Sequence, residues 1–463
     1  MCVLTYFNCG YFSFPWWYPL NNKPSGNTVV IQIRQRWAWR LSAALCNHLI
    51  IASKHLIGDP SVLSCISGNC NYWSNTLTTQ TYCTDFSTNV DVSYGEKYDT
   101  RTIPIGVQFS IAFSSCCWFV SLVIGAGSPW NVVTRINTII RPDGYINSSP
   151  SAAIMPLIYK QVNIQHTHVI QMVDPDASDI LRCRWASVAG NVNSYNECGG
   201  VCSGIPGATL ITNNCTLIFT LTRPSIYAAV ALQIEDYYNE TSSIPMSSVP
   251  VQFLFYGYTP ISTCITPPNL ISNRPDPECV DTSVGSTVTE RFTVHVLCAN
   301  KVIVDFVTSS PLGMTKSAIR SPSLGIYEID FNWVPATSQR GSQSLCIGAV
   351  DNTNIQSNQL CTTYLVDFEA PSFIRNSARP VGTTFENQTT FSIRSTKPIA
   401  RPSSGKGGEI HFFDATLNKL VESFKSTSQS DVKYSEFEIF IKFKKAPWII
   451  GHSYYVKLDA GIY

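Results

Sequence analysis

The sequence predicts an all-β protein made of tandem β-sandwich modules that are stapled by disulfides. Short runs of alternating apolar and polar residues recur along the chain, and proline-rich segments separate them. The 17 cysteines are spread over most of the length. At 463 residues the chain is too long for one sandwich, and roughly 100–200 residues per domain implies several modules.

The composition indicates an extracellular protein, either secreted or the ectodomain of an anchored one. Charged residues make up only 14% of the chain, and the net charge of +1 argues against nucleic-acid binding. The cysteines include no C-x-x-C pair of the kind that zinc sites use, so disulfides in an oxidising compartment are the better interpretation. Four Asn-x-Ser/Thr sequons are candidate glycosylation sites: Asn147, Asn214, Asn239 and Asn387.

Two apolar stretches need an interpretation before the modules are assigned. Residues 1–20 are aromatic and apolar, but no Lys or Arg precedes Lys23, so they form a poor signal peptide. We interpret them as the truncated start of a longer chain, with a leader as the alternative. Residues 103–127 are long enough to cross a membrane. They are also rich in β-branched and aromatic residues, which predicts two buried strands joined at residues 114–115.

Residues 21–150 are expected to form a cysteine-containing β domain with one short helix. Residues 29–41 alternate in character, with Val29, Ile31, Ile33, Trp37 and Trp39 on one face and Gln32, Arg34, Arg36 and Arg40 on the other. A period of two predicts a half-buried strand whose arginines lie in water. Helical spacing of Leu45, Leu49, Ala52 and Leu56 predicts a short helix before Gly58.

The cysteines of the first half suggest several bridges. Cys46, Cys65, Cys70 and Cys83 are candidates for two disulfides, among three alternative pairings. Cys116 and Cys117 point to opposite faces if the chain is extended there, so we expect different partners, with a redox pair as the alternative. Cys198 and Cys202 flank a glycine-rich loop that we expect to be bridged to Cys183 and Cys215; a redox pair or a metal clip is the alternative. The odd total leaves at least one thiol unpaired or bonded to another chain.

Residues 151–257 and 258–369 share a rhythm and are expected to form two sandwiches. Each has a proline-rich start, an aromatic strand, a cysteine-bearing strand that ends in an acidic residue, and a final apolar strand. Residues 345–350 and 360–367 predict a hairpin around residues 352–354. Cys346 and Cys361 are equidistant from its centre, and a bridge between them contributes about 2–4 kcal/mol.

Residues 370–463 lack cysteine and are expected to form a final sandwich. One strand alternates, with Phe437, Ile439, Ile441 and Phe443 facing in and Glu436, Glu438, Lys442 and Lys444 facing out. Residues 411–424 predict a hairpin. The chain stops at residues 454–463, in or just past a strand, which again suggests a fragment, and no membrane anchor is visible.

These segments resemble known extracellular modules. Residues 333–366, which run from a Trp-Val-Pro segment to a strand ending in Ala-Val-Asp, are similar to the closing half of dystroglycan-type cadherin-like and immunoglobulin-like modules. Residues 171–185 and 230–239 are similar to the same class, and residues 381–399 and 452–463 resemble bacterial-type immunoglobulin-like domains. The chain as a whole resembles large multi-module extracellular proteins of invertebrate animals. The resemblance implies immunoglobulin/cadherin-like sandwiches and no particular ligand.

Carboxylates near residue 175 are the best candidate for a metal site. Asp174, Asp176 and Asp179, with Glu235 and Asp236 from a later segment, could supply oxygens to a calcium ion at a turn. The alternative is a solvated turn in which the aspartates cap the backbone. Asp351, with Asn352 and Asn354, is a second turn of this kind. His166 and His168 would lie on one face of a strand and could chelate zinc or copper, but no third ligand is identifiable.

The sequence gives no support for catalysis. It contains no G-x-S-x-G, H-E-x-x-H, Walker or G-x-G-x-x-G motif. We therefore expect a non-catalytic protein for adhesion, matrix or surface recognition, whose partner is a protein or a glycan. A secreted carbohydrate-binding or carbohydrate-active protein is the alternative, and exposed aromatics along one sheet face would favour it. No organic cofactor is expected, and calcium is the only expected ion.

Overall fold

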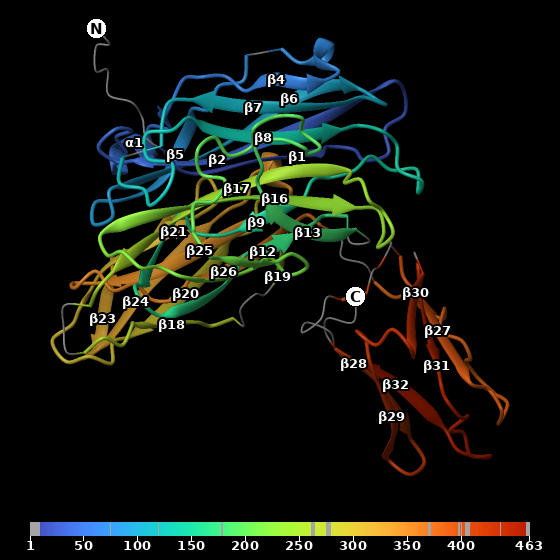
Figure 1. Ribbon diagram of the computed structural model, residues 1–463. Coiled ribbons are helices and arrows are strands. Elements are labelled where there is room, and N and C mark those ends of the chain that lie inside the picture. Colours follow the sequence, from blue (N-terminus) through green and yellow to red (C-terminus); the bar gives the residue numbers. More distant parts are fainter. Residues whose placement is uncertain are drawn as a thin grey trace, which may run out of the picture. The chain divides into compact units, whose positions relative to one another are not determined.

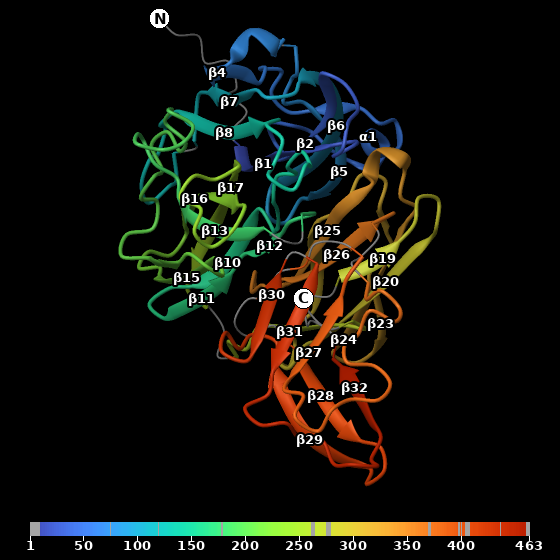
Figure 2. The ribbon, with the colours of Figure 1, turned by 90° about the vertical axis from the view of Figure 1, so that its right-hand side faces the viewer.

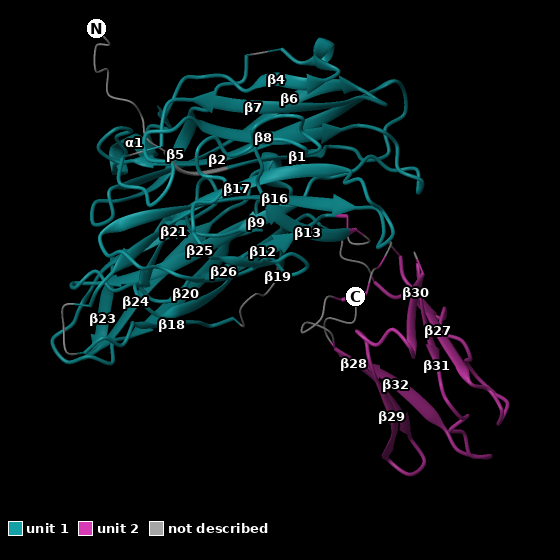
Figure 3. Cartoon of the chain, viewed as in Figure 1, with its two compact units in different colours: residues 1–175, 180–368 teal, residues 176–179, 369–463 magenta. Residues whose placement is uncertain are grey.

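The computed structural model is built almost entirely from strands (Figure 1). It describes residues 10–74, 76–118, 120–176, 179–260, 264–274, 279–368, 372–396, 399, 401–402, 408–435 and 437–459. Contacts divide the chain into two units, drawn in different colours in Figure 3. Unit 1 comprises residues 1–175 and 180–368, and unit 2 comprises residues 176–179 and 369–463.

The largest sheet takes strands from both of the first two expected regions. Its path is β3 (Leu56–Ile57), β5 (Thr81–Ser87), β6 (Val92–Pro104), β2 (Thr28–Arg40), β1 (Gly10–Pro19), β17 (Ser247–Tyr258), β8 (Trp130–Asn137), β7 (Gln108–Ser115) and β4 (Ser64–Gly68). Two further strands, β10 (Leu157–Gln161) and β16 (Ile226–Tyr237), pair with β17, and β13 (Ile180–Trp185) pairs with β16.

The strand β17 joins the first two regions into one body. It pairs with β1 and β8 from the first region and with β10 and β16 from the second. In both ribbon views β17 lies between β8 and β16 (Figure 1, Figure 2). Phe253, Leu254 and Phe255 of this strand are fully buried. The expected boundary at residue 150 is therefore corrected, because one sheet and one apolar core run across it.

The alternative interpretation of residues 1–20 as a leader is corrected for residues 10–19, because they form a strand of the folded chain. Residues 10–19 form β1, which lies between β2 and β17, and Phe14, Trp16 and Trp17 are buried in the core. An aromatic stretch without charge fits a central strand as well as it fits a signal peptide. Residues 1–9 lie outside the described residues.

The predicted helix is present but shorter than expected. The helix α1 (His48–Ala52) is capped by Asn47, whose side-chain oxygen accepts hydrogen bonds from the backbone amides of Leu49 and Ile50. Leu56, expected on its apolar face, lies instead in β3. Two short 3-10 turns, η1 (Cys70–Tyr72) and η2 (Thr337–Gln339), complete the helical segments of the described chain.

The stretch at residues 103–127 is not a pair of strands joined at residues 114–115. It holds the end of β6, the whole of β7 and a loop that begins after Ser115. Phe109, Ile111 and Phe113 of β7 are buried in the sheet. Among the described residues, the structure contains no helix with the length and apolarity that a membrane crossing requires.

The third expected region is a two-sheet sandwich within unit 1. One sheet contains β18 (Asn269–Ser272), β20 (Val288–His295), β24 (Ile326–Trp333), β22 (Thr315–Lys316) and β23 (Arg320–Ser323). The other contains β19 (Cys279–Thr282), β26 (Leu360–Val366), β25 (Gly341–Asp351) and β21 (Ile303–Ser309). Phe292, Phe331, Trp333 and Tyr364 form its core. Two small sheets, β11 (Gln165–Val169)–β15 (Thr216–Thr220)–β14 (Thr209–Ile211) and β12 (Gln171–Val173)–β9 (Ser151–Ala153), complete the unit.

Unit 2 is a smaller sandwich that confirms the alternation expected in it. Its sheets are β27 (Thr390–Arg394)–β31 (Glu438–Lys442)–β30 (Val432–Ser435) and β29 (Lys419–Lys425)–β28 (Glu409–Asp414)–β32 (Tyr454–Leu458). Ile439, Ile441 and Phe443 are buried, whereas Phe437 is half-buried. Glu436 and residues 460–463 lie outside the described residues. The hairpin predicted for residues 411–424 is β28–β29.

Seven disulfides join described cysteines of unit 1. They join Cys46–Cys83, Cys65–Cys70, Cys116–Cys117, Cys183–Cys215, Cys198–Cys202, Cys264–Cys298 and Cys346–Cys361. Cys346 and Cys361 are register partners of β25 and β26, which confirms the bridged hairpin.

Two disulfide expectations are corrected. Cys116 and Cys117 bond each other, because they lie in a bend beyond β7 where the alternation of a strand does not apply. Cys198 and Cys202 also bond each other instead of reaching Cys183 and Cys215.

The second face of β2 is buried, which corrects the expectation that its arginines lie in water. Gln32, Arg34 and Arg36 are all buried, whereas Arg40 at the strand end is exposed. The start of β25 covers this face: Arg34 Nη1 donates to the Ser342 carbonyl at 2.8 Å, and Arg36 Nη1 donates to Ser344 Oγ at 2.7 Å. The sandwich of residues 264–368 is thus fixed to the first sheet by buried polar contacts.

Ion pairs complete this contact, which we call the seam (β2, β5 and β6 against residues 305–344). Arg36 Nε lies 2.7 Å from Glu96 Oε1, and Glu96 Oε2 accepts the Leu312 amide at 2.6 Å. Lys316 Nζ lies 2.7 Å from Asp85 Oδ1. Burial and the Glu96 carboxylate raise the pKa of Tyr98, which lies between Glu96 and Gln343, well above its usual value. A buried charge is tolerated only when its partners are in place.

The substitution Arg36→Met tests the seam. It leaves Glu96 buried without its cation, so the free energy of unfolding of unit 1 falls by roughly 3–5 kcal/mol. Urea unfolding followed by tryptophan fluorescence measures the change. The control is Arg291→Met, because the Arg291–Asp330 pair is exposed and its loss leaves the midpoint almost unchanged. Equal effects of the two substitutions would contradict a structural role for the seam.

Candidate functional site

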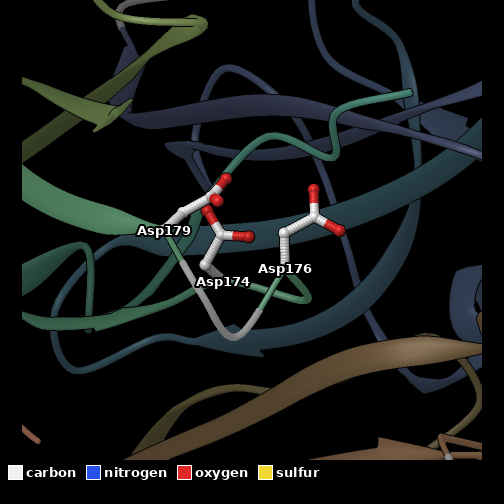
Figure 4. A group of neighbouring side chains, drawn as sticks. All are labelled: Asp174, Asp176 and Asp179. Atoms are coloured by element: carbon white, nitrogen blue, oxygen red, sulfur yellow. The ribbon is translucent and has the colours of Figure 1, made fainter. Parts of the chain in front are cut away.

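The turn between β12 and β13 brings three of the five predicted metal ligands together. One carboxylate oxygen from each of Asp174, Asp176 and Asp179 lies within 4.8 Å of the others (Figure 4). The amide of Asp179 donates to the Asp176 carbonyl at 3.0 Å, which closes the turn. Ala177 and Ser178 lie outside the described residues. Three carboxylates at this spacing could supply part of the oxygen shell of a Ca²⁺ ion.

Asp236, another predicted ligand, does not join this group. Its side chain is fully buried, and both of its oxygens accept hydrogen bonds from protein donors. Oδ2 accepts from Asn147 Nδ2 at 2.6 Å, and Oδ1 accepts from the Ser247 amide and hydroxyl at 2.6 and 2.7 Å. Burial raises the pKa of Asp236 in spite of these donors. Asp236 therefore anchors β16 to β17 and to the segment around Asn147.

The turn at Asp351 is occupied by the protein itself. Asp351 Oδ1 accepts hydrogen bonds from the Thr353 and Ile355 amides at 2.8 and 2.9 Å. Oδ2 lies 3.0 Å from Lys301 Nζ, and both of these side chains are buried. The second predicted calcium turn is thus corrected: it is a capped turn with an internal cation.

The two histidines of β11 have separate environments. His166 Nε2 lies 2.7 Å from the Gln161 carbonyl, whereas His168 is buried against Phe253 and Phe255. Burial lowers the pKa of His168 from 6.5 to about 3, with Lys160 and His166 adding to the effect. The described part of the chain places these histidines in no group of potential metal ligands, so His168 is a neutral core residue.

The four sequons differ in accessibility. Asn214, Asn239 and Asn387 are exposed, whereas Asn147 is fully buried with its amide nitrogen bonded to Asp236. N-glycosylation modifies that same nitrogen, so the folded chain offers no room for a glycan at Asn147. The sequence carries no signal for this burial, because the partner lies 89 residues away.

Two glutamates form a second charged cluster, and one of them, Glu235, is also one of the predicted metal ligands. Arg184 donates to both oxygens of Glu197, at 2.7 and 2.8 Å, and its Nε donates to Glu235 Oε1 at 2.8 Å. Glu197 is fully buried, and Asn193 also donates to it. The cluster holds the loop of residues 187–197 against β13 and β16, so its carboxylates serve the fold.

Part of the chain is similar to one family of known proteins. Residues 12–139, which cover β1 to β8, match the family model described as the N-terminal region of integrin beta-like proteins A–E. Integrin beta-like protein C of Dictyostelium discoideum is 22% identical over 284 residues, which are 56% of this chain and 14% of that protein. The chain therefore spans only a small part of the length of this relative. Together with the disulfides, the matches point to an extracellular, multi-module protein.

Solved structures add little to this comparison. The crystal structure of Rst D1-D2 is 9% identical, covers 48% of this chain and 100% of that chain, and has a TM-score of 0.17. The fibronectin(III)-like modules of Clostridium thermocellum CbhA are 11% identical, cover 47% of this chain and 94% of that chain, and have a TM-score of 0.16. Scores this low carry no argument, and the all-β class rests on the strands described above.

The pH dependence of stability tests the environment of His168. The unfolded chain binds a proton near pH 6.5, whereas the folded chain excludes it until about pH 3. The free energy of unfolding is therefore unaffected by His168 above pH 6.5. Between pH 6.5 and about pH 3 it falls by roughly 1.4 kcal/mol per pH unit, because only the unfolded chain binds the proton. In urea unfolding between pH 7 and pH 4, His168→Leu removes that slope. His55→Leu, at an exposed position, keeps it. A slope unchanged by His168→Leu would contradict the burial.

Proposed function

We propose that the chain is a non-catalytic part of an extracellular protein that acts in adhesion, matrix contact or surface recognition. The match of residues 12–139 to the integrin beta-like family is the observation that carries the proposal. The proposal has two finer parts. Individual modules are cadherin-like or immunoglobulin-like, and the chain is related to large multi-module extracellular proteins of invertebrate animals.

The construction of unit 1 supports this role. The matched segment is built into a sheet with β17 and is covered by residues 305–344, so loops far apart in sequence are held at fixed positions. Rigid scaffolds that display loops are typical of recognition proteins. The buried charges described above are paired with one another or with backbone groups, as structural ion pairs are, and this favours recognition over catalysis.

A glycan is the second candidate ligand, and one observation favours it. Phe413 of β28 and Tyr455 of β32 are register partners whose rings stack at 5.0 Å with an interplanar angle of 7°. Tyr455 and the neighbouring Leu420 are exposed. The exposed Tyr455 offers one ligand both an apolar ring face and a hydroxyl group that can form a hydrogen bond.

We also propose that the turn of Asp174, Asp176 and Asp179 binds Ca²⁺. Its three carboxylates supply hard oxygen ligands, and a cation would offset their mutual repulsion. Asp236 is left out of this site because its oxygens are engaged elsewhere. Calcium bound here would tie the start of β13 to the end of β12.

A cell-attachment assay tests the adhesive role. Cells are counted on surfaces coated with the native chain or with the reduced and alkylated chain, and we expect several-fold more attachment to the native chain. Equal attachment to both would contradict adhesion.

A matched pair of variants separates the two ligand classes. Tyr455 and Tyr72 are equally exposed, at 46% and 47%. A loss of attachment with Tyr455→Ala but not with Tyr72→Ala assigns the contact to a glycan on the stacked face, whereas no loss with either assigns it to a protein.

Thermal unfolding with calcium or with a chelator tests the metal site. Saturating calcium stabilises the folded chain, by about 2.7 kcal/mol at a hundred times the dissociation constant. We expect a higher midpoint with calcium, and no shift in the double variant D174N/D176N. The control is Asp281→Asn, an exposed carboxylate outside the turn. A midpoint that calcium leaves unchanged would exclude the site.

A further inference from the structure

Three loops meet at one end of unit 2. Thr390 pairs with Lys442 at one end of β27 and β31, and Asp414 pairs with Tyr454 at one end of β28 and β32. Residues 443–453 connect these two ends. Trp448 Nε1 donates to the Gln388 carbonyl at 2.6 Å, and the Ser453 amide donates to Thr416 Oγ1 at 2.9 Å. We call residues 380–389, 415–418 and 443–453 the tip.

Large apolar side chains at the tip face solvent. Phe385 and Ile450 are 80% and 82% exposed, and Val381, Leu417 and Ile449 are exposed as well. Trp448 precedes Ile449 and Ile450 on the same loop, and its ring lies against Phe443 and Tyr454 at 5.3 and 5.0 Å. These aromatic contacts hold the loop that carries the two exposed isoleucines. A gathering of exposed apolar side chains marks a surface that another body covers.

The surroundings of the tip are basic. Lys444 and Lys445 are exposed on the tip, and Lys419 is exposed next to it at the start of β29, against one exposed acid of the tip, Glu386. The Asp414 carboxylate is directed inward, 2.6 Å from His452 Nδ1. Residues 369–463 hold thirteen Lys and Arg against nine Asp and Glu, a net charge of +4, whereas the rest of the chain sums to −3. The charge favours an anionic surface as the covering body.

Both ends of the described segment 372–459 lie at the other end of its two sheets. Phe373 bridges Ser395, beyond the far end of β27, and residues 374–379 then run toward the tip. β32 runs away from the tip, from Tyr454 to Leu458, and the Asp459 amide donates to the Glu409 carbonyl at the far end of β28. Neither end of this described segment emerges beside the tip, so a neighbouring stretch of the same segment does not explain the exposed apolar residues there.

We propose that the tip is a membrane-contact site that inserts Phe385 and Ile450 into the interfacial layer of a bilayer with anionic headgroups. Apolar side chains gain free energy by leaving water at that depth, while Lys444 and Lys445 contact the headgroup phosphates. This combination of exposed apolar residues and adjacent lysines favours a lipid surface over a protein partner. The inference is independent of the proposed function, because it concerns unit 2 and a lipid ligand.

Vesicle cosedimentation tests the site with the full chain. Vesicles of phosphatidylcholine alone are compared with vesicles that also contain phosphatidylserine. We expect binding to the anionic vesicles, weakened at least tenfold by the double variant F385S/I450S and by K444E/K445E. The controls are Leu324→Ser and Lys54→Glu, which remove an exposed leucine and an exposed lysine of unit 1. These substitutions leave binding unchanged.

Three results would overturn the proposal. The first is no binding to either vesicle type, and the second is binding that the tip variants leave intact. The third is self-association that F385S/I450S abolishes, in a chain that binds no vesicles, which would make a second copy of the chain the occupant of the tip.

The exposed sequon at Asn387 lies within the tip, so the secreted protein is tested beside N387Q. A fourth result, binding by N387Q but not by the glycosylated chain, would mean that a glycan shields the tip, and would overturn the role for the secreted protein.

Discussion

Two buried guanidinium groups, on Arg34 and Arg36, fix the sandwich of residues 264–368 to the first sheet. They donate to the Ser342 carbonyl and to the Ser344 hydroxyl, and Glu96 balances the charge of Arg36. Such groups are costly to bury unless every partner is in place, so the seam tolerates little displacement. Apolar contact reinforces it, because Val307, Cys346 and Val350 belong to the same core as β2 and β17. The strands of unit 1 thus behave as one body.

The sequence predicts the strands of this fold better than their surroundings. Alternation at residues 29–41 identifies β2, but it cannot show that another sandwich covers the arginine face, because that partner lies about 300 residues further along. The composition of residues 10–19 fits both a central strand and a leader. Only their pairing with β2 and β17 shows that they form a strand. The Cys346–Cys361 bridge is predictable because its hairpin is local.

The same distinction between local and distant contacts applies to the candidate sites. Asp174, Asp176 and Asp179 meet because a single turn holds them, and the sequence identifies that group. Asp236 was added from a distant strand, and the structure directs it to Asn147 instead. The exposed tip of unit 2 was missed because hydrophobic residues in loops look like core residues until their burial is known. Adhesion by a rigid unit 1 and lipid contact by unit 2 would be compatible roles within one extracellular protein.

Native-state hydrogen exchange tests the central claim, that the seam makes one cooperative body, most directly. Amides of β2 on one side and of β25 on the other are followed at increasing concentrations of urea. If the seam holds the two as one body, both strands exchange through the same unfolding event, with the same free energy and the same dependence on urea. Exchange of β25 at a lower free energy, while β2 stays protected, would show that residues 264–368 unfold on their own and would contradict the account.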